Sequence, residues 1–143
     1  MVVHVESSCS EQRQIAYDVI GYCYNQLIPY NNVNIFLKIK TIESQNADGW
    51  CQHNYGNNFD ITIEESLSVN KLIKTICHEM VHVKQGVKNE LVEAYVGKCM
   101  RLWKGIDCDE FKDTDISPWE IEAYKLEEEL YNSFMEQRWK KIH

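Results

Sequence analysis

The first part of the chain contains stretches in which apolar and polar residues alternate, the pattern of half-buried strands. In residues 33–42 (VNIFLKIKTI) the apolar positions are Val33, Ile35, Leu37 and Ile39. This alternation predicts a strand with one buried face. Short stretches rich in β-branched or aromatic residues predict three further strands, at 1–6, 50–55 and 59–63.

Apolar residues also recur three or four positions apart, which is the spacing of one helix face. This spacing predicts four helices, over about 8–28, 68–85, 89–103 and 117–141. Gly86 is expected to be the C-cap of the second helix. The fourth helix has a clear start, because Ser117, Pro118 and Glu120 fit the N-cap, first and third positions of a capping box. The acidic segment 105–117 before it is expected to be a loop.

The order of these elements, strands and one helix first and then mostly helices, predicts the α+β class. The length of 143 residues suits one domain that can bury a real core. We therefore expect a single domain over 1–143, with a small N-terminal β-sheet and a helical C-terminal half.

Composition excludes several function classes. A net charge of −7 argues against general binding to nucleic-acid backbones, which needs clustered Lys and Arg. No apolar run is long enough to cross a bilayer, and the start MVVHVESS lacks the features of a secretion signal. The six cysteines include no CxxC pair and are expected to be reduced thiols. We expect a soluble cytoplasmic protein (in the host cytoplasm if the protein is viral), with no membrane or nucleic-acid partner.

The segment His78-Glu79-Met80-Val81-His82 carries the chemistry that the sequence indicates most strongly. Two histidines four residues apart on a helix lie on one face, so both imidazoles can bind one metal ion. Glu79 then lies beside the ion and can take a proton from a metal-bound water. Zinc suits two imidazoles plus an oxygen ligand. The alternative is that the histidines are two solvent-facing side chains on an amphipathic helix.

A catalytic zinc site needs a third protein ligand and an open position. Lys88 stands where the HExxHxxGxxH motif would require a third histidine, so a carboxylate is expected. Four glutamates are candidates: Glu90, Glu93, Glu120 and Glu122. Glu120 already has a role in the capping box. Glu122 has no comparable local partner and is followed by the small residue Ala123, so it is preferred. The run 127–129 (EEE) is interpreted as a solvated helix face.

Three segments together resemble small HExxH metallopeptidase-like proteins of phages and bacteria, which are similar to minimal gluzincins and loosely to SprT-like proteins. The segments are 75–85 (TICHEMVHVKQ), 103–105 (WKG) and 117–124 (SPWEIEAY), and the resemblance covers about residues 59–130. It implies a zincin-like fold, with Phe59–Ile63 as a strand flanking the active-site helix. It also implies a glutamate ligand on a later helix that is commonly followed by alanine, which is Glu122 here. The third histidine and zinc ribbon of SprT proteins are missing, so cleavage of DNA-bound proteins is not implied.

Two functions remain in view from the sequence. The first is a zinc metallopeptidase that hydrolyses peptide bonds, with His78, His82 and Glu122 as zinc ligands and Glu79 as the base. In this hypothesis a peptide or protein substrate pairs with the strand at 59–63. The second is a non-enzymatic zinc-binding protein that acts through protein–protein interaction. The presence of Glu79 favours the first, because a structural zinc site does not need a base.

Overall fold

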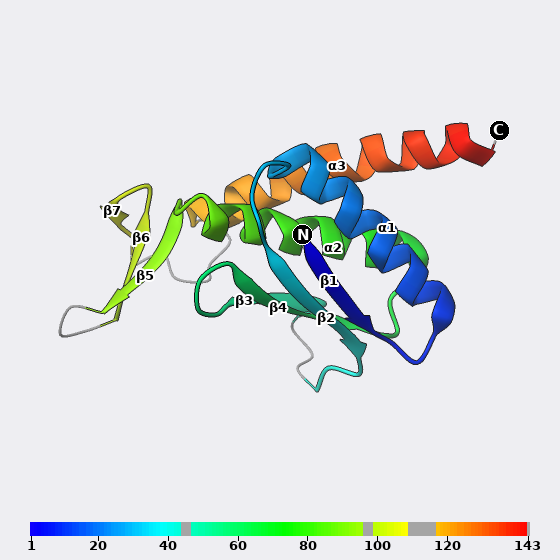
Figure 1. Cartoon of the computed structure of the whole chain (residues 1–143), viewed down its shortest axis with the longest axis horizontal. Helices are drawn as coiled ribbons and strands as arrows, with labels where there is room; N and C mark the ends of the chain where they lie inside the picture. Colours follow the sequence, from blue (N-terminus) through cyan, green and yellow to red (C-terminus); the bar gives the residue numbers. More distant parts are fainter. Residues whose placement is uncertain (44–46, 96–98, 109–116, 143) are drawn as a thin grey trace.

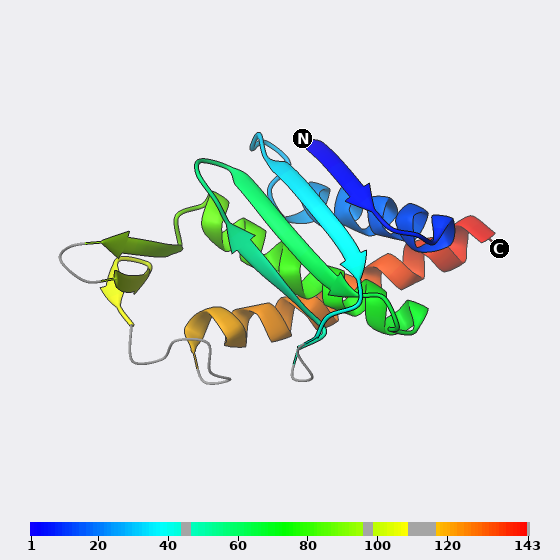
Figure 2. The same cartoon turned by 90° about the horizontal axis from the view of Figure 1, so that it is seen from below.

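The computed structural model describes residues 1–43, 47–95, 99–108 and 117–142. These residues form an α+β structure with three helices (Figure 1). A four-stranded sheet near the N-terminus has the strand order β1-β2-β4-β3, and a second sheet has the order β5-β6-β7. The three helices lie on one face of the larger sheet, as the two views in Figures 1 and 2 agree.

The four strands of the first sheet follow the alternation of the sequence. They are β1 (Val2–Glu6), β2 (Asn34–Lys40), β3 (Gly49–His53) and β4 (Asn58–Glu64). β1, β2 and β4 run parallel, and β3 pairs antiparallel with β4 at the edge of the sheet. The buried side chains Ile35, Leu37 and Ile39 alternate with more exposed neighbours along β2. The predicted strands are therefore confirmed, each to within a few residues.

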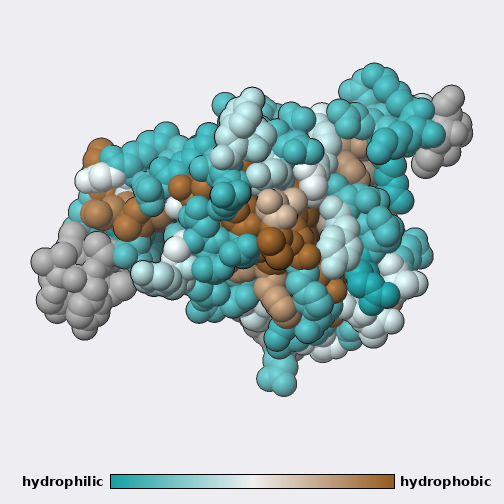
Figure 3. Space-filling model, in the orientation of Figure 1, coloured by the Kyte–Doolittle hydropathy of each residue, from teal (hydrophilic) through white to brown (hydrophobic). Residues whose placement is uncertain are grey.

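The helices are α1 (Ser10–Leu27), α2 (Val69–Val87) and α3 (Pro118–Ile142). α1 follows Cys9, whose side chain makes no capping hydrogen bond. The side chain of Ser68 caps α2 by accepting a hydrogen bond from the backbone of Lys71 at 3.3 Å. Side chains of α1, α2, β2, β4 and α3 meet in one apolar core that includes Ile20, Leu37, Ile61, Ile76 and Ala123. The face of the molecule in Figure 3 is mostly hydrophilic, with hydrophobic residues gathered near its centre.

The helix predicted over 89–103 is wrong, and the C-terminal half is therefore not wholly helical. This segment contains β5 (Leu91–Tyr95) and β6 (Cys99–Trp103), which pair antiparallel, and β7 (Ile106–Asp107) extends the sheet. The backbone of Asn89 has a φ of 56°, so the chain leaves the helical path just after α2. Figure 1 shows this small sheet projecting at one end of the molecule.

The turn between β6 and β7 explains why these two strands pair as a hairpin. Lys104 and Gly105 separate the paired residues Trp103 and Ile106, and both have positive φ, 50° and 86°. Two-residue hairpin loops favour positive φ at both positions because their twist then matches that of the strands. The sequence signal for this turn was Lys104-Gly105 between the apolar residues Trp103 and Ile106. The helical periodicity of the preceding segment obscured it. The loop predicted at 105–117 lies largely outside the described residues.

Gly86 is not a C-cap, because α2 continues to Val87 and Lys88 follows as its C-cap. It is instead a point of close approach between the helix and the sheet. A Cβ atom at Gly86 would lie 2.7 Å from Cε1 of Phe59 and 3.0 Å from Nδ1 of His53. The absence of a side chain at this position lets α2 lie close to β3 and β4.

This packing predicts opposite effects for two glycine-to-alanine substitutions within helices. Gly86→Ala is expected to lower the free energy of unfolding by about 1–3 kcal/mol, because the new methyl group overpacks a rigid ring. Gly21→Ala on α1 is the matched control, since a Cβ there meets nothing within 4 Å. It should raise the free energy of unfolding by up to about 1 kcal/mol through helix propensity. Urea unfolding of both variants measures this, and equal stabilities would contradict the close-approach role of Gly86.

Candidate metal centre

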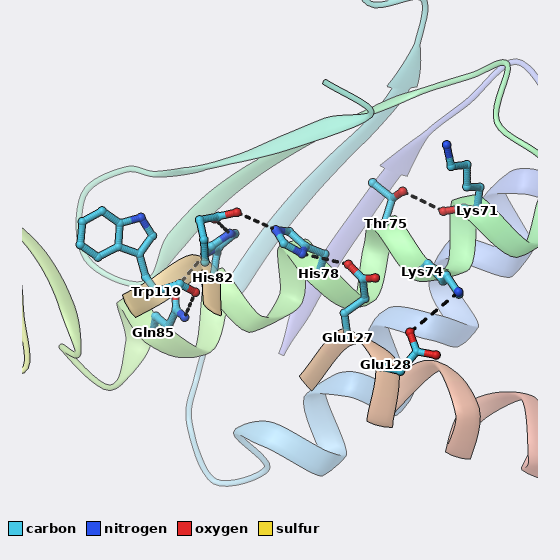
Figure 4. A network of polar contacts seen from close by, with 10 residues as sticks. Lys71, Lys74, Thr75, His78, His82, Gln85, Trp119, Glu127 and Glu128 are labelled. Atoms are coloured by element: carbon cyan, nitrogen blue, oxygen red, sulfur yellow. Dashed lines mark hydrogen bonds and ion pairs between the residues drawn. The ribbon is translucent and has the colours of Figure 1, made fainter. Parts of the chain in front are cut away.

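α2 carries both histidines of the HExxH segment on one side, where Figure 4 shows His78 and His82 a turn apart. The two side chains are largely buried, with 11% and 15% of their surface exposed. Glu79 follows His78 and is buried, with 5% of its surface exposed. The two imidazoles and this carboxylate all line the same cleft.

The third member of the cluster is Glu120, from the first turn of α3. Its Oε1 lies 2.6 Å from Nε2 of His82, and its Oε2 lies 3.3 Å from Nε2 of His78. Ligand atoms of the three residues lie within 4.8 Å of one another, so the group could hold a metal ion. Two imidazole nitrogens and a carboxylate oxygen are a donor set that suits Zn²⁺.

This placement corrects the preference for Glu122 as the third ligand. The first turn of α3 begins after Ser117, whose carbonyl accepts hydrogen bonds from the backbone of Glu120 and Ile121. The Glu120 side chain points toward the histidines of α2. Glu122 is two residues further on and so points to another side of the helix. Its Oε1 lies 2.8 Å from Nζ of Lys84.

The other two candidates also lie outside the cluster. Glu90 forms an ion pair with Lys84 at 2.8 Å. Glu93 forms one with Arg101 at 2.9 Å. Among the described residues, the group that could hold a metal ion contains Glu120 as its only carboxylate.

Glu127 contacts the cluster, which the sequence analysis did not predict. Its Oε1 lies 3.0 Å from Nδ1 of His78, and its side chain is only 18% exposed (Figure 4). The interpretation of Glu127 as a solvated charge is therefore wrong. The spacing along α3 could have indicated this position. Glu120, Tyr124 and Glu127 are separated by four and three residues and so lie on one face of the helix. The Tyr124 ring also lies against His78, with centroids 4.7 Å apart.

The second imidazole nitrogen of each histidine thus has its own partner. Nδ1 of His78 faces Glu127, and Nδ1 of His82 lies 2.8 Å from Oε1 of Gln85. Such partners orient metal-binding histidines and fix which nitrogen binds. Both Nε2 atoms face Glu120, so these are the nitrogens that could bind an ion.

The carboxylates around His78 shift its protonation strongly. Burial alone lowers the pKa of His78, but hydrogen bonds to Glu120 and Glu127 outweigh it and raise the pKa to about 10. Burial likewise acts to raise the pKa of Glu120, yet hydrogen bonds from His78 and His82 lower it to about 2. The pKa of Glu79 is raised, chiefly by burial. In the metal-free protein the cluster is therefore held together by charged hydrogen bonds.

The cleft over this cluster has a volume of about 1070 Å³. One wall is β3 with its flanking residues, and the other is formed by the first turns of α3 together with β5 and β6. β4 lies inside the sheet between β2 and β3. The expectation that a peptide pairs with Phe59–Ile63 is therefore wrong. Among the strands that the structure describes, β3 (Gly49–His53) is the one at the sheet edge beside the cleft.

Helices long and apolar enough to cross a membrane are not found in the part of the chain that the structure describes. Comparisons with protein-family models, with curated proteins and with solved structures found no match. The geometry of the cleft is therefore the basis for any functional conclusion.

The pKa of His78 predicts how the stability of the metal-free protein changes with pH. Its folded value of about 10 lies above its ordinary value of 6.5. The stabilisation from its charged form is therefore complete below about pH 6.5 and is lost as the pH rises through 10. The measurement is urea unfolding with a chelator present. The free energy of unfolding of wild type should exceed that of His78→Asn by a larger margin at about pH 6 than at about pH 10.

The exposed histidine of β1 provides a control for this measurement. His4→Asn should leave the free energy of unfolding nearly unchanged at both pH values, because the side chain of His4 is 57% exposed. A gap between wild type and His78→Asn that is equal at both pH values would contradict the predicted charge network.

Proposed function

We propose that this protein is a zinc-dependent hydrolase of peptide bonds, with His78, His82 and Glu120 as the zinc ligands. The observation that carries the proposal is the approach of Glu120 to both imidazoles beside a buried glutamate and an open cleft. The likeness of segment 78–82 to HExxH peptidases also supports it. On this proposal the fold is zincin-like, with α2 as the active-site helix. A cytoplasmic location stays a prediction.

Zinc, when bound, supplies Lewis acidity that lowers the pKa of a coordinated water to about 7 and polarises a carbonyl group. The protein supplies the ligands and their orientation. Glu127 and Gln85 hold the two imidazole rings through their Nδ1 atoms. Glu120 comes from a different helix, so the site is complete only when α3 is docked on α2.

Glu79 is the residue that we assign as the base. It follows His78 on α2 and lines the cleft, and its burial raises the pKa of its carboxyl group. A base with a raised pKa can take a proton at neutral pH and release it again. Glu79 would take a proton from the attacking water as the new C–O bond forms. It would then pass that proton to the amide nitrogen as the C–N bond breaks.

The shape of the cleft favours an extended peptide as substrate. β3 is the outer strand of the sheet, so backbone groups on its free edge can pair with an added strand. The cleft lining includes residues 47–54 on this side, and Glu79 and the histidines lie beside them. A bound peptide would thus be held along the same cleft that carries the metal ligands.

Two glutamate substitutions on α3 test the ligand assignment. Glu120→Ala should weaken zinc binding by more than about 100-fold, since loss of a direct ligand costs more than loss of an orienting partner. Glu122→Ala should weaken zinc binding by less than about tenfold. Competition with a chromophoric chelator measures both affinities. The ligand set would have to be revised if Glu122→Ala lost most of the affinity while Glu120→Ala kept it.

A substitution at Glu79 tests the mechanism separately from metal binding. Glu79→Gln should keep zinc affinity close to wild type and lower the rate of peptide cleavage by about 10²–10⁴-fold. A fluorescently labelled unfolded protein, with and without chelator, provides the assay. If Glu79→Gln cleaved the substrate at the wild-type rate in a zinc-dependent way, the assignment of Glu79 as the base would be wrong. Zinc binding by wild type without any cleavage would favour the non-enzymatic alternative.

A further inference from the structure

Gln85 is a fully buried amide where the C-terminal end of α2 meets the first turn of α3, with 0% of its surface exposed. It lies three residues after His82, and its side chain takes part in three hydrogen bonds. Oε1 lies 2.8 Å from Nδ1 of His82. Nε2 donates to the carbonyl oxygen of Trp119 at 2.9 Å and to Oε1 of Glu122 at 3.1 Å. A buried polar group is costly unless it is satisfied, so this arrangement constrains the amide closely.

The two groups on one side of the amide decide which way it points. The carbonyl oxygen of Trp119 can only accept a hydrogen bond. The same is true of the ionised carboxylate of Glu122. Lys84 Nζ lies 2.8 Å from the same Glu122 oxygen and helps to hold that carboxylate in place. The NH₂ group of Gln85 must therefore face Trp119 and Glu122, and its oxygen must face His82. Figure 4 shows Gln85 between Trp119 and His82.

This orientation in turn decides the tautomer of His82. An amide oxygen can only accept, so Nδ1 of His82 must carry a hydrogen. In the metal-free protein Nε2 donates its own hydrogen to Glu120, 2.6 Å away. When that hydrogen is lost, Nδ1 keeps its hydrogen and the lone pair lies on Nε2, the atom that could bind a metal ion. His78 needs no such device, because its Nδ1 faces the carboxylate of Glu127, which accepts with either oxygen.

We propose that Gln85 is a positioning residue that fixes the Nε2-binding tautomer and the ring orientation of His82, and that Glu122 and the Trp119 carbonyl orient it. The inference rests on the proposed function, since it assigns a role toward the same metal. It also links two ligands, because the carbonyl held by Gln85 belongs to the residue before Glu120. One amide thus sets His82 on α2 relative to the first turn of α3.

The test compares Gln85→Leu with wild type. Leucine has a similar volume and no acceptor for Nδ1 of His82. We expect zinc affinity to fall about 10- to 100-fold, as is typical when an orienting partner is lost. In the zinc-free protein, ¹⁵N–¹H NMR of the histidine side chains should show a protected Nδ1–H of His82 in wild type, which becomes rapidly exchanging in Gln85→Leu.

Glu122→Ala keeps Gln85 in place and serves if Gln85→Leu fails to fold. It should lower zinc affinity a few-fold and reduce the protection of Nδ1–H, because one of the two groups that orient the amide is gone. Glu128→Ala is its matched control, since Glu128 is also a glutamate of α3 paired with a lysine, at 3.9 Å from Lys74. Glu128→Ala should change neither measurement.

A core substitution separates positioning from general stability. Ile20→Val trims a buried side chain of α1 and should lower thermal stability without changing zinc affinity. The proposal is overturned if Gln85→Leu changes stability alone, with zinc affinity and the His82 signal as in wild type. If wild type itself binds no zinc, the proposed function fails, while the NMR signal still reports whether Gln85 holds the Nδ1–H of His82.

Discussion

The packing of α2 between the sheet and α3 is the constraint on which the rest of the structure depends. Eleven residues of α2 are buried, and they include the polar side chains of Glu79 and Gln85. Gly86 lets the helix approach Phe59 closely, and Ala123 of α3 is fully buried in the shared core. A helix enclosed in this way can present polar side chains only where a partner or the cleft receives them.

The contact between α2 and α3 meets this requirement with a connected set of polar groups. Glu120 and Glu127 reach the histidines, and Gln85 joins His82 to Trp119 and Glu122. The same contacts therefore dock the two helices and arrange the candidate metal ligands. A network of this kind stabilises the fold only when its members are all satisfied, which is why each of these side chains has a defined partner.

Two groups of strands shape the cleft, and the sequence predicted only the first of them. β3 lies at the sheet edge because β4 is enclosed between β2 and β3. β5 and β6 add a second wall. The positive φ of Asn89 takes the chain off the helical path before β5, and the Lys104-Gly105 turn joins β6 to β7. On the proposed function, an extended chain would lie between these walls beside the histidines, which line the same cleft. The function proposed for the site depends on this access as much as on the ligands.

The sequence alone determined the features that depend on local spacing. The strands of the first sheet, the position of α2, and the shared face of His78 and His82 all follow from periods of two or 3.6 residues. The strands within 91–103 were predicted as a helix because their apolar residues also fit a helical period, whereas the backbone leaves the helical path at Asn89.

Only the tertiary structure decided the third ligand and the partners of the histidines. Glu120 and Glu122 differ by about 200° around α3, so the choice between them depends on how α3 is rotated when it docks. Local capping rules favoured a purely structural role for Glu120, yet its side chain turns to the histidines of α2. Glu127 and Gln85 gained their roles in the same way. Spacing places Glu127 on the same face of α3 as Glu120, and Gln85 one turn after His82 on α2. Only the docking of α3 decides which of its faces meets α2 and brings Trp119 and Glu122 to Gln85.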